Sequence, residues 1–215
     1  MTDRMTIIVA DDHPLFRGAM RQALASAAEG ALIVEAGDFS AARAAAEAHP
    51  EADLLLLDLT MPGVSGLSGL MALRAEFPSL PIMVVSAHDD ASTVERSLAL
   101  GACGFLPKSS SIEDIRSGIE TVMAGDVHAP EGIRRGGAED ADLRGLVQRL
   151  ATLTPQQSRV LSMLAEGLLN KQIAYELGVS EATIKAHVSA ILLKLNVDSR
   201  TQAVIQLARL TTVPA

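Results

Sequence analysis

Largely apolar runs alternate with segments of helical spacing along the first 124 residues of the chain. Five short runs are rich in Leu, Ile, Val and Met: 5–10, 31–36, 53–59, 81–87 and 104–107. Apolar residues recur at helical spacing in the segments between and after them, near 14–28, 40–49, 66–77, 91–100 and 111–124. Apolar strands that alternate with helices are typical of a parallel sheet covered on both faces. The pattern predicts a doubly wound α/β domain with a five-stranded parallel sheet over residues 1–125.

The pattern changes after residue 125. Residues 126–151 are rich in Gly, Pro and charge and show no period, which indicates a linker. Order returns at Thr154, where Pro155 and Gln157 complete the signature of a capping box at a helix start. Helical segments follow near 155–166, 171–177, 181–195 and 200–210. Residues 152–212 are therefore predicted to form a small all-α domain of four helices.

The middle of this second domain has the pattern of a helix-turn-helix. Gly178 marks a turn and Ser180 an N-cap, and the helix that follows carries its apolar residues on one face. Its opposite surface carries the small residues Ala186 and Ala190, flanked by cations such as Lys185. Small residues let a helix enter the major groove of DNA, although charge alone favours the solvated face of an ordinary helix pair.

Charge divides unevenly along the chain, whose formal net charge is −8. Residues 1–126 carry 8 Lys and Arg against 18 Asp and Glu, a balance of −10, and residues 127–215 carry 10 against 8, a balance of +2. The two domains are thus expected to have different partners. The apolar runs fall short of the roughly 18 residues that a membrane helix needs, and no signal peptide is recognisable. We therefore expect a cytoplasmic protein with no membrane partner.

Three carboxylates fall at the predicted carboxyl ends of two strands. Asp11 and Asp12 follow the first strand and Asp58 ends the third. Because the carboxyl ends of parallel strands meet at one edge of the sheet, these side chains should share one pocket. Like charges destabilise each other at such a distance, and a hard divalent cation removes the repulsion. Mg²⁺ takes oxygen ligands and leaves positions open for a phosphoryl group, so the cluster predicts Mg²⁺ as cofactor.

Two further side chains end neighbouring strands. Ser86 lies near the end of the fourth strand and can donate a hydrogen bond to a phosphoryl oxygen, while Lys108 follows the fifth and supplies a positive charge. Taken singly, a strand-end serine is most often a local hydrogen-bonding group and a lysine a solvated one. Their common position at one sheet edge favours a phosphoryl site.

The motifs "VADDHPLFRGAM", "LLLLDLTMPGVSGL", "VVSA" and "GACGFLPKSS" resemble the receiver domain of two-component response regulators, a flavodoxin-like fold. The resemblance implies that Asp58 accepts a phosphoryl group from a cognate histidine kinase, in contact with Ser86 and Lys108. It also implies that Phe105 is the aromatic switch residue. The implied Mg²⁺ ligands are Asp11, Asp12, Asp58 and the backbone carbonyl of Thr60.

Residues 153–204 resemble the LuxR-type DNA-binding domain, which together with the receiver identifies a member of the NarL/FixJ family. The implied DNA contacts are Lys171, Thr183, Lys185, His187 and Lys194. The last helix begins near a second capping box, Ser199 and Gln202, and a domain this small covers only one side of it. We expect its apolar residues to contact a second copy when the protein is active, as a homodimer, through Val204, Ile205 and Leu207.

The sequence thus predicts a phosphorylation-switched transcription factor that binds double-stranded promoter DNA and is not a turnover enzyme. One alternative is an atypical regulator of the same fold that is controlled without phosphorylation. A phosphatase of the haloacid-dehalogenase kind is another, but its chemistry wants a second acid where Thr60 stands. A quorum-sensing regulator would need an aromatic-lined pocket, and the chain has one Tyr, four Phe and no Trp.

Overall fold

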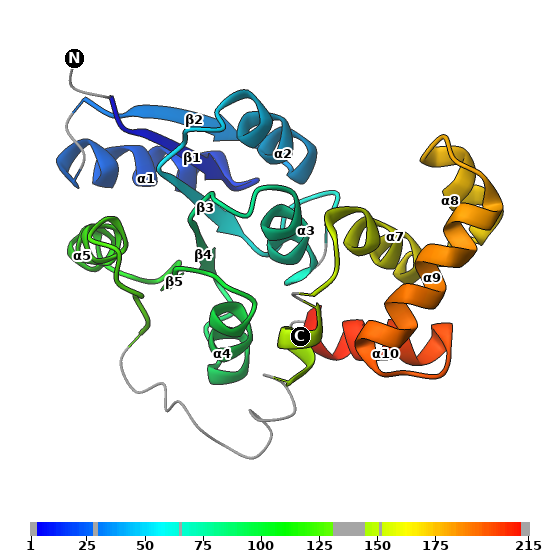
Figure 1. Cartoon of the computed structure of the whole chain (residues 1–215). Helices are drawn as coiled ribbons and strands as arrows, with labels where there is room; N and C mark the ends of the chain where they lie inside the picture. Colours follow the sequence, from blue (N-terminus) through cyan, green and yellow to red (C-terminus); the bar gives the residue numbers. More distant parts are fainter. Residues whose placement is uncertain (1–3, 28–29, 65, 131–144, 151, 212–215) are drawn as a thin grey trace. The chain divides into compact units, whose positions relative to one another are not determined.

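The computed structural model describes residues 4–27, 30–64, 66–130, 145–150 and 152–211 (Figure 1). They fall into two compact units, residues up to 130 in the first and residues from 145 onward in the second. The first unit is α/β and the second is helical, as the hydrophobic pattern predicts.

The first unit is built on a five-stranded parallel sheet with the strand order β2-β1-β3-β4-β5. Every residue of β1, β3 and β4 is buried, which explains why these strands read as unbroken apolar runs. The prediction of a doubly wound sheet is confirmed. The strands are β1 (Thr6–Ala10), β2 (Leu32–Ala36), β3 (Leu54–Asp58), β4 (Ile82–Ser86) and β5 (Gly104–Pro107).

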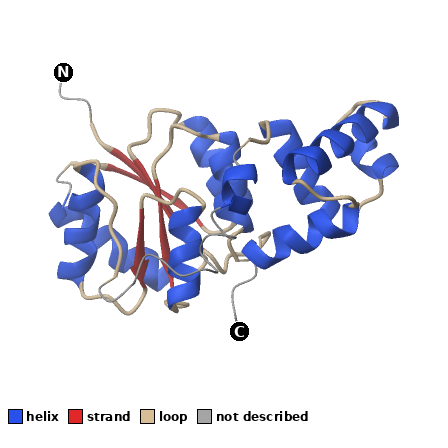
Figure 2. Cartoon of the chain, turned by 60° about the horizontal axis from the view of Figure 1, so that its bottom comes forward, coloured by secondary structure: helices blue, strands red, loops and turns tan. Residues whose placement is uncertain are grey.

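Helices cover both faces of this sheet, as the red strands between blue helices show (Figure 2). Alternate residues of β3 divide between two cores: Leu54 and Leu56 pack with α1 and α5, and Leu55 and Leu57 pack with α2, α3 and α4. The helices are α1 (Pro14–Ala27), α2 (Phe39–Ala48), α3 (Ser68–Glu76), α4 (Ala91–Ala99) and α5 (Ile112–Met123).

A short extended segment beyond α5 lies along the edge strand β5. His128 forms a parallel bridge with Gly104, and its carbonyl accepts a hydrogen bond from the Phe105 amide over 3.0 Å. A Cβ placed on Gly118 of α5 would lie 3.0 Å from the His128 ring, so the glycine makes room for that ring. Burial lowers the pKa of His128, which the nearby Asp114 only partly offsets. The start of the segment predicted as linker is therefore tied to the strand that carries Phe105.

The second unit contains α7 (Pro155–Ala165), α8 (Asn170–Glu176), α9 (Glu181–Leu195) and α10 (Arg200–Thr211), and residues 145–150 are also helical. The capping box predicted at α7 is present, with the Thr154 hydroxyl accepting from the Gln157 amide. α9 ends at Asn196, whose φ of 56° is left-handed, a conformation that asparagine tolerates. None of the helices in the described part of the chain is long and apolar enough to cross a membrane.

Candidate metal centre and nucleic-acid interface

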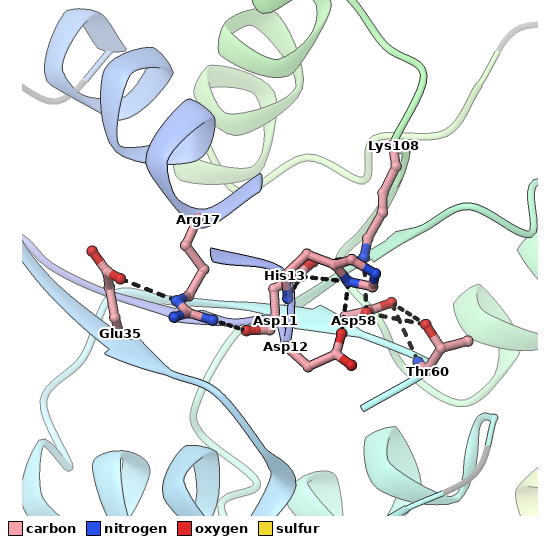
Figure 3. Close-up of polar contacts among 8 residues, drawn as sticks. All are labelled: Asp11, Asp12, His13, Arg17, Glu35, Asp58, Thr60 and Lys108. Carbon is pink, nitrogen blue, oxygen red and sulfur yellow. Dashed lines mark hydrogen bonds and ion pairs between the residues drawn. The ribbon is translucent and has the colours of Figure 1, made fainter. Parts of the chain in front are cut away.

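The acidic side chains lie at the carboxyl edge of the sheet, where its strand order reverses between β1 and β3. Ligands of doubly wound folds bind at such a switch point because the connections on either side diverge there. Asp11 and Asp12 follow β1, and Asp58 is the last residue of β3. The structure brings these three together with His13: each offers a ligand atom within 4.8 Å of those of the others (Figure 3).

Two of these carboxylates are deeply buried. Asp11 is 2% exposed and Asp58 is 1% exposed, whereas Asp12 is half-buried at the rim. The amide of His13 donates to Oδ1 of Asp11 over 2.7 Å, which fixes that side chain at the start of α1. Nδ1 of His13 lies 2.7 Å from Oδ1 of Asp12 and 3.3 Å from Oδ1 of Asp11. The imidazole of His13 thus contacts both carboxylates of the acid pair, although the His13 side chain is 64% exposed.

Lys108 bridges the two buried carboxylates. Its Nζ lies 2.7 Å from Oδ2 of Asp11 and donates to Oδ2 of Asp58 over 2.8 Å. Burial alone would lower the pKa of this ammonium, but the two carboxylates outweigh burial and raise it, so the lysine is charged at neutral pH. The Phe16 ring supports the ammonium, with its centroid 5.0 Å from Nζ. Lys108 therefore holds Asp11 and Asp58 together through its positive charge.

The residues present fit a hard divalent cation. Oδ2 of Asp11 and Oδ1 of Asp12 are buried without a hydrogen bond in the described part of the chain, although each has an ion-pair partner. Three carboxylates share this pocket with one lysine, so their mutual repulsion is only partly offset and a further cation would relieve it. The donors are mainly carboxylate oxygens, which suit Mg²⁺, whereas the imidazole of His13 suits softer metals.

The remaining receiver residues singled out from the sequence lie around Asp58. The Thr60 hydroxyl lies 3.1 Å from each Asp58 carboxylate oxygen, and the Thr60 amide lies 3.3 Å from Oδ1. Ser86 is fully buried and its Oγ accepts from the His88 amide over 3.1 Å, which leaves its hydroxyl proton to donate. Phe105 is fully buried in β5, two positions before the strand ends.

Two charged residues next to the acid pair, Arg17 and Glu35, were not identified from the sequence. Arg17 of α1 donates to the backbone carbonyl of Asp11 over 2.6 Å and to Glu35 of β2 over 3.1 Å (Figure 3). The apolar spacing of α1 gives no reason to select this arginine among exposed cations. The feature that could have identified these residues is the sheet register. It pairs Val9 with Glu35 and so places Glu35 next to the strand that leads to the acid pair.

In the second unit, α8 and α9 form the predicted helix-turn-helix. Ile184, Ile191 and Leu195 of α9 are buried, which leaves the face with Lys185 exposed. Lys185 is 65% exposed and pairs with Glu181 one turn earlier over 3.0 Å. The other proposed DNA contacts on these helices are the exposed Lys171 and Thr183 and the half-buried His187.

Lys194, near the end of α9, is held by the start of α7. Its Nζ donates to the Thr152 carbonyl over 2.6 Å and to Oε1 of Gln157 over 2.8 Å. Gln157 is also the residue that closes the capping box of α7. The lysine therefore fixes α9 against α7, and two of its three donors are already engaged in this contact.

The apolar side chains of α10 differ in exposure. Leu207 is 3% exposed, Val204 is half-buried and Ile205 is 54% exposed. Ile205 is thus the most exposed of the three α10 residues that were predicted to contact a second copy.

Comparison with known proteins agrees with both units. Residues 7–120 match the model of the response regulator receiver domain, and residues 151–207 match that of the bacterial regulatory proteins of the luxR family. The chain is 42% identical over 205 residues to a glycerol metabolism activator of Pseudomonas putida, and the alignment covers 93% of both proteins. It is 36% identical over 199 residues to the nitrate/nitrite response regulator protein NarP of Escherichia coli, covering 93% of this chain and 92% of NarP.

A solved structure resembles the whole chain. RcsB from Salmonella enterica serovar Typhimurium, bound to a promoter in the presence of the phosphomimetic BeF3⁻, is 27% identical with a TM-score of 0.56. The match covers 97% of this chain and 100% of that one.

Proposed function

Because the chain belongs to the response regulators that join a receiver domain to a luxR-family DNA-binding domain, we propose that phosphoryl transfer to Asp58 switches its binding to promoter DNA. Its relatives are transcriptional regulators rather than turnover enzymes, and the two domains of this chain are theirs. The phosphoryl donor is a histidine kinase, and the active species is a homodimer.

The observation that carries the proposal is the group of three carboxylates at one edge of the sheet, two of them buried and bridged by Lys108. Carboxylates buried this close together repel each other and cost stability, so their grouping indicates a use beyond the fold. Here Asp58 ends a buried strand beside one compact cation and the amide of Thr60. Such an environment supports a nucleophile that receives an anionic group.

The chain's own residues have distinct roles in this transfer. An Asp58 oxygen forms a bond to phosphorus while the bond from phosphorus to the kinase imidazole breaks, and the imidazole nitrogen keeps the electron pair. Lys108 and the Thr60 amide then face the new phosphoryl oxygens, and the Ser86 hydroxyl donates to one of them. Asp11, Asp12, Asp58 and the Thr60 carbonyl would hold Mg²⁺, which would neutralise part of the phosphoryl charge when bound.

The kinase must reach Asp58 across the carboxyl edge of the sheet. Leu15, the second residue of α1, is 91% exposed beside the acid pair. Because α1 begins at the pocket, a protein that approaches Asp58 along this edge would meet Leu15. We assign this rim of the pocket to the kinase.

The proposal is tested by DNA binding of the full-length protein with and without a small phosphodonor and Mg²⁺, on sites selected from a random pool. We expect phosphodonor to tighten binding to paired half-sites at least about tenfold, because linking two weak contacts raises their effective concentration. Asp58→Asn should not respond. Equal binding by treated and untreated wild type would instead favour the same fold controlled by protein concentration.

Lys185 provides a separate test of the DNA interface. Its exposed ammonium on α9 suits a backbone phosphate, so Lys185→Ala should weaken DNA binding and make its dependence on salt shallower by about one unit. Binding is measured at several salt concentrations, with Arg159→Ala on α7, outside the helix-turn-helix, as the control. An unchanged slope and affinity would remove Lys185 from the interface.

A further inference from the structure

The guanidinium of Arg17, which takes no part in the proposed transfer, contacts the backbone of Asp11. Nη1 of Arg17 donates to the Asp11 carbonyl over 2.6 Å, and Nε donates to Oε2 of Glu35 over 3.1 Å. Arg17 belongs to α1, Asp11 to the connection after β1, and Glu35 to the edge strand β2 (Figure 3). One side chain, only 18% exposed, therefore joins three backbone segments where the candidate metal ligands begin.

These contacts fix the backbone of Asp11 on both sides. Its amide donates to the Ala36 carbonyl over 3.0 Å, and its own carbonyl accepts from Arg17. Because a peptide bond is planar, holding the Asp11 carbonyl also orients the bond that leads to Asp12. Oδ1 of Asp12 is buried and lies 2.7 Å from Nδ1 of the adjacent His13, so the direction of this carboxylate follows the backbone of residues 11–13.

We propose that Arg17 is a positioning residue for the metal site, acting through the Asp11 carbonyl on the directions of the Asp11 and Asp12 carboxylates. The inference rests on the proposed function, because it concerns the affinity of that site for Mg²⁺. Groups that orient metal ligands typically change metal affinity by about 10–100-fold when they are removed. Arg17 contacts neither a ligand oxygen nor the phosphoryl pocket in the described part of the chain, which separates this role from that of Lys108.

A positioning role and a purely electrostatic role of Arg17 predict opposite changes in Mg²⁺ affinity for Arg17→Gln. A nearby cation repels Mg²⁺, so if Arg17 acted only through its charge, Arg17→Gln would tighten Mg²⁺ binding and Arg17→Lys would leave it unchanged. If Arg17 positions the acid pair, both variants weaken binding, because lysine keeps the charge but lacks the planar fork that reaches two acceptors.

Arg21 is the matched control. Its Nη2 lies 2.9 Å from Oε1 of the same Glu35, yet its side chain is 62% exposed and has no hydrogen bond to Asp11 among the described residues. Arg21→Gln removes a cation from the same cluster while leaving the Asp11 carbonyl held by Arg17. We expect Mg²⁺ binding by this variant to stay within about twofold of wild type, since an exposed charge is well screened.

The test is the Mg²⁺ dissociation constant of the full-length protein, measured by isothermal titration calorimetry for wild type, Arg17→Lys, Arg17→Gln and Arg21→Gln. The proposal predicts about tenfold weaker binding for both Arg17 variants and no such change for Arg21→Gln. Circular dichroism checks that each variant is folded. Should the Arg17 variants fail to fold, Glu35→Asp, which keeps the negative charge but shortens the side chain that anchors Arg17, is predicted to weaken binding a few-fold, whereas charge alone predicts no change.

The outcomes separate this inference from the function on which it rests. If wild type binds Mg²⁺ and Arg17→Lys binds it equally well, the positioning role is wrong and the proposed function stands. Tighter binding by Arg17→Gln would also overturn the positioning role in favour of charge. If wild type itself shows no Mg²⁺ binding, the Mg²⁺ step of the proposed function is wrong.

Discussion

Lys108→Met is expected to lower the free energy of unfolding of the receiver domain by about 3 kcal/mol in Mg²⁺-free buffer at neutral pH. Lys108 holds the buried carboxylates of Asp11 and Asp58 at 2.7 and 2.8 Å, and methionine leaves both without a cation. Removing one partner of a buried ion pair is costly because the remaining charge is uncompensated. Mg²⁺ should recover more than half of the loss, since it supplies positive charge to the same oxygens.

Hydrogen exchange of the β3 amides measures this effect, because these amides report the receiver domain alone. Arg116→Met is the control within the same domain: the Arg116 side chain is 51% exposed, and its substitution should change stability by less than about 0.5 kcal/mol. If Lys108→Met equals wild type with and without Mg²⁺, the lysine does not stabilise the carboxylate cluster.

The sheet and its acid cluster could be predicted from the sequence because both follow from short-range patterns. Unbroken apolar runs such as Leu54–Asp58 indicate strands buried on both faces, and all five strands were found there. Parallel strands place their carboxyl ends at one edge, so the grouping of Asp11, Asp12 and Asp58 needed no knowledge of side-chain positions.

The contacts of long side chains could not be predicted in this way. Lys194 stays a predicted DNA contact from the resemblance, and its ammonium also reaches the Thr152 carbonyl, 42 residues away in the chain, a contact that local spacing does not indicate. Arg17 could be selected only with Glu35, and their proximity depends on how α1 packs beside β2. Local spacing shows which face of a helix a lysine or arginine occupies, but its flexible stem can reach several partners. Which of these partners it contacts depends on the tertiary structure.

The segment around His128 shows a second limit. It is a few residues of extended chain in a region rich in Gly, Pro and charge, so no period marks it. Its place beside β5 depends on Gly104 and Gly118, which leave room for His128 on two different elements. Such a fit between distant small residues carries no periodic signal along the sequence.

Asp58→Asn is expected to abolish phosphorylation of the chain. Asparagine keeps the shape of the side chain, but its amide nitrogen is not a nucleophile and the site loses one of three negative charges. Mg²⁺ affinity should fall about tenfold, because the charge of the ligands sets the affinity of oxygen sites. Lys108 keeps its ion pair with Asp11, so the variant should remain folded.

Mass spectrometry of the intact, full-length protein after treatment with a small phosphodonor tests the central claim most directly. We predict that wild type gains the mass of one phosphoryl group when Mg²⁺ is present, that a chelator prevents the gain, and that Asp58→Asn shows none. Asp126→Asn, an exposed carboxylate away from the cluster, should behave as wild type. Equal phosphorylation of Asp58→Asn and wild type, or phosphorylation that persists unchanged in chelator, would contradict the account.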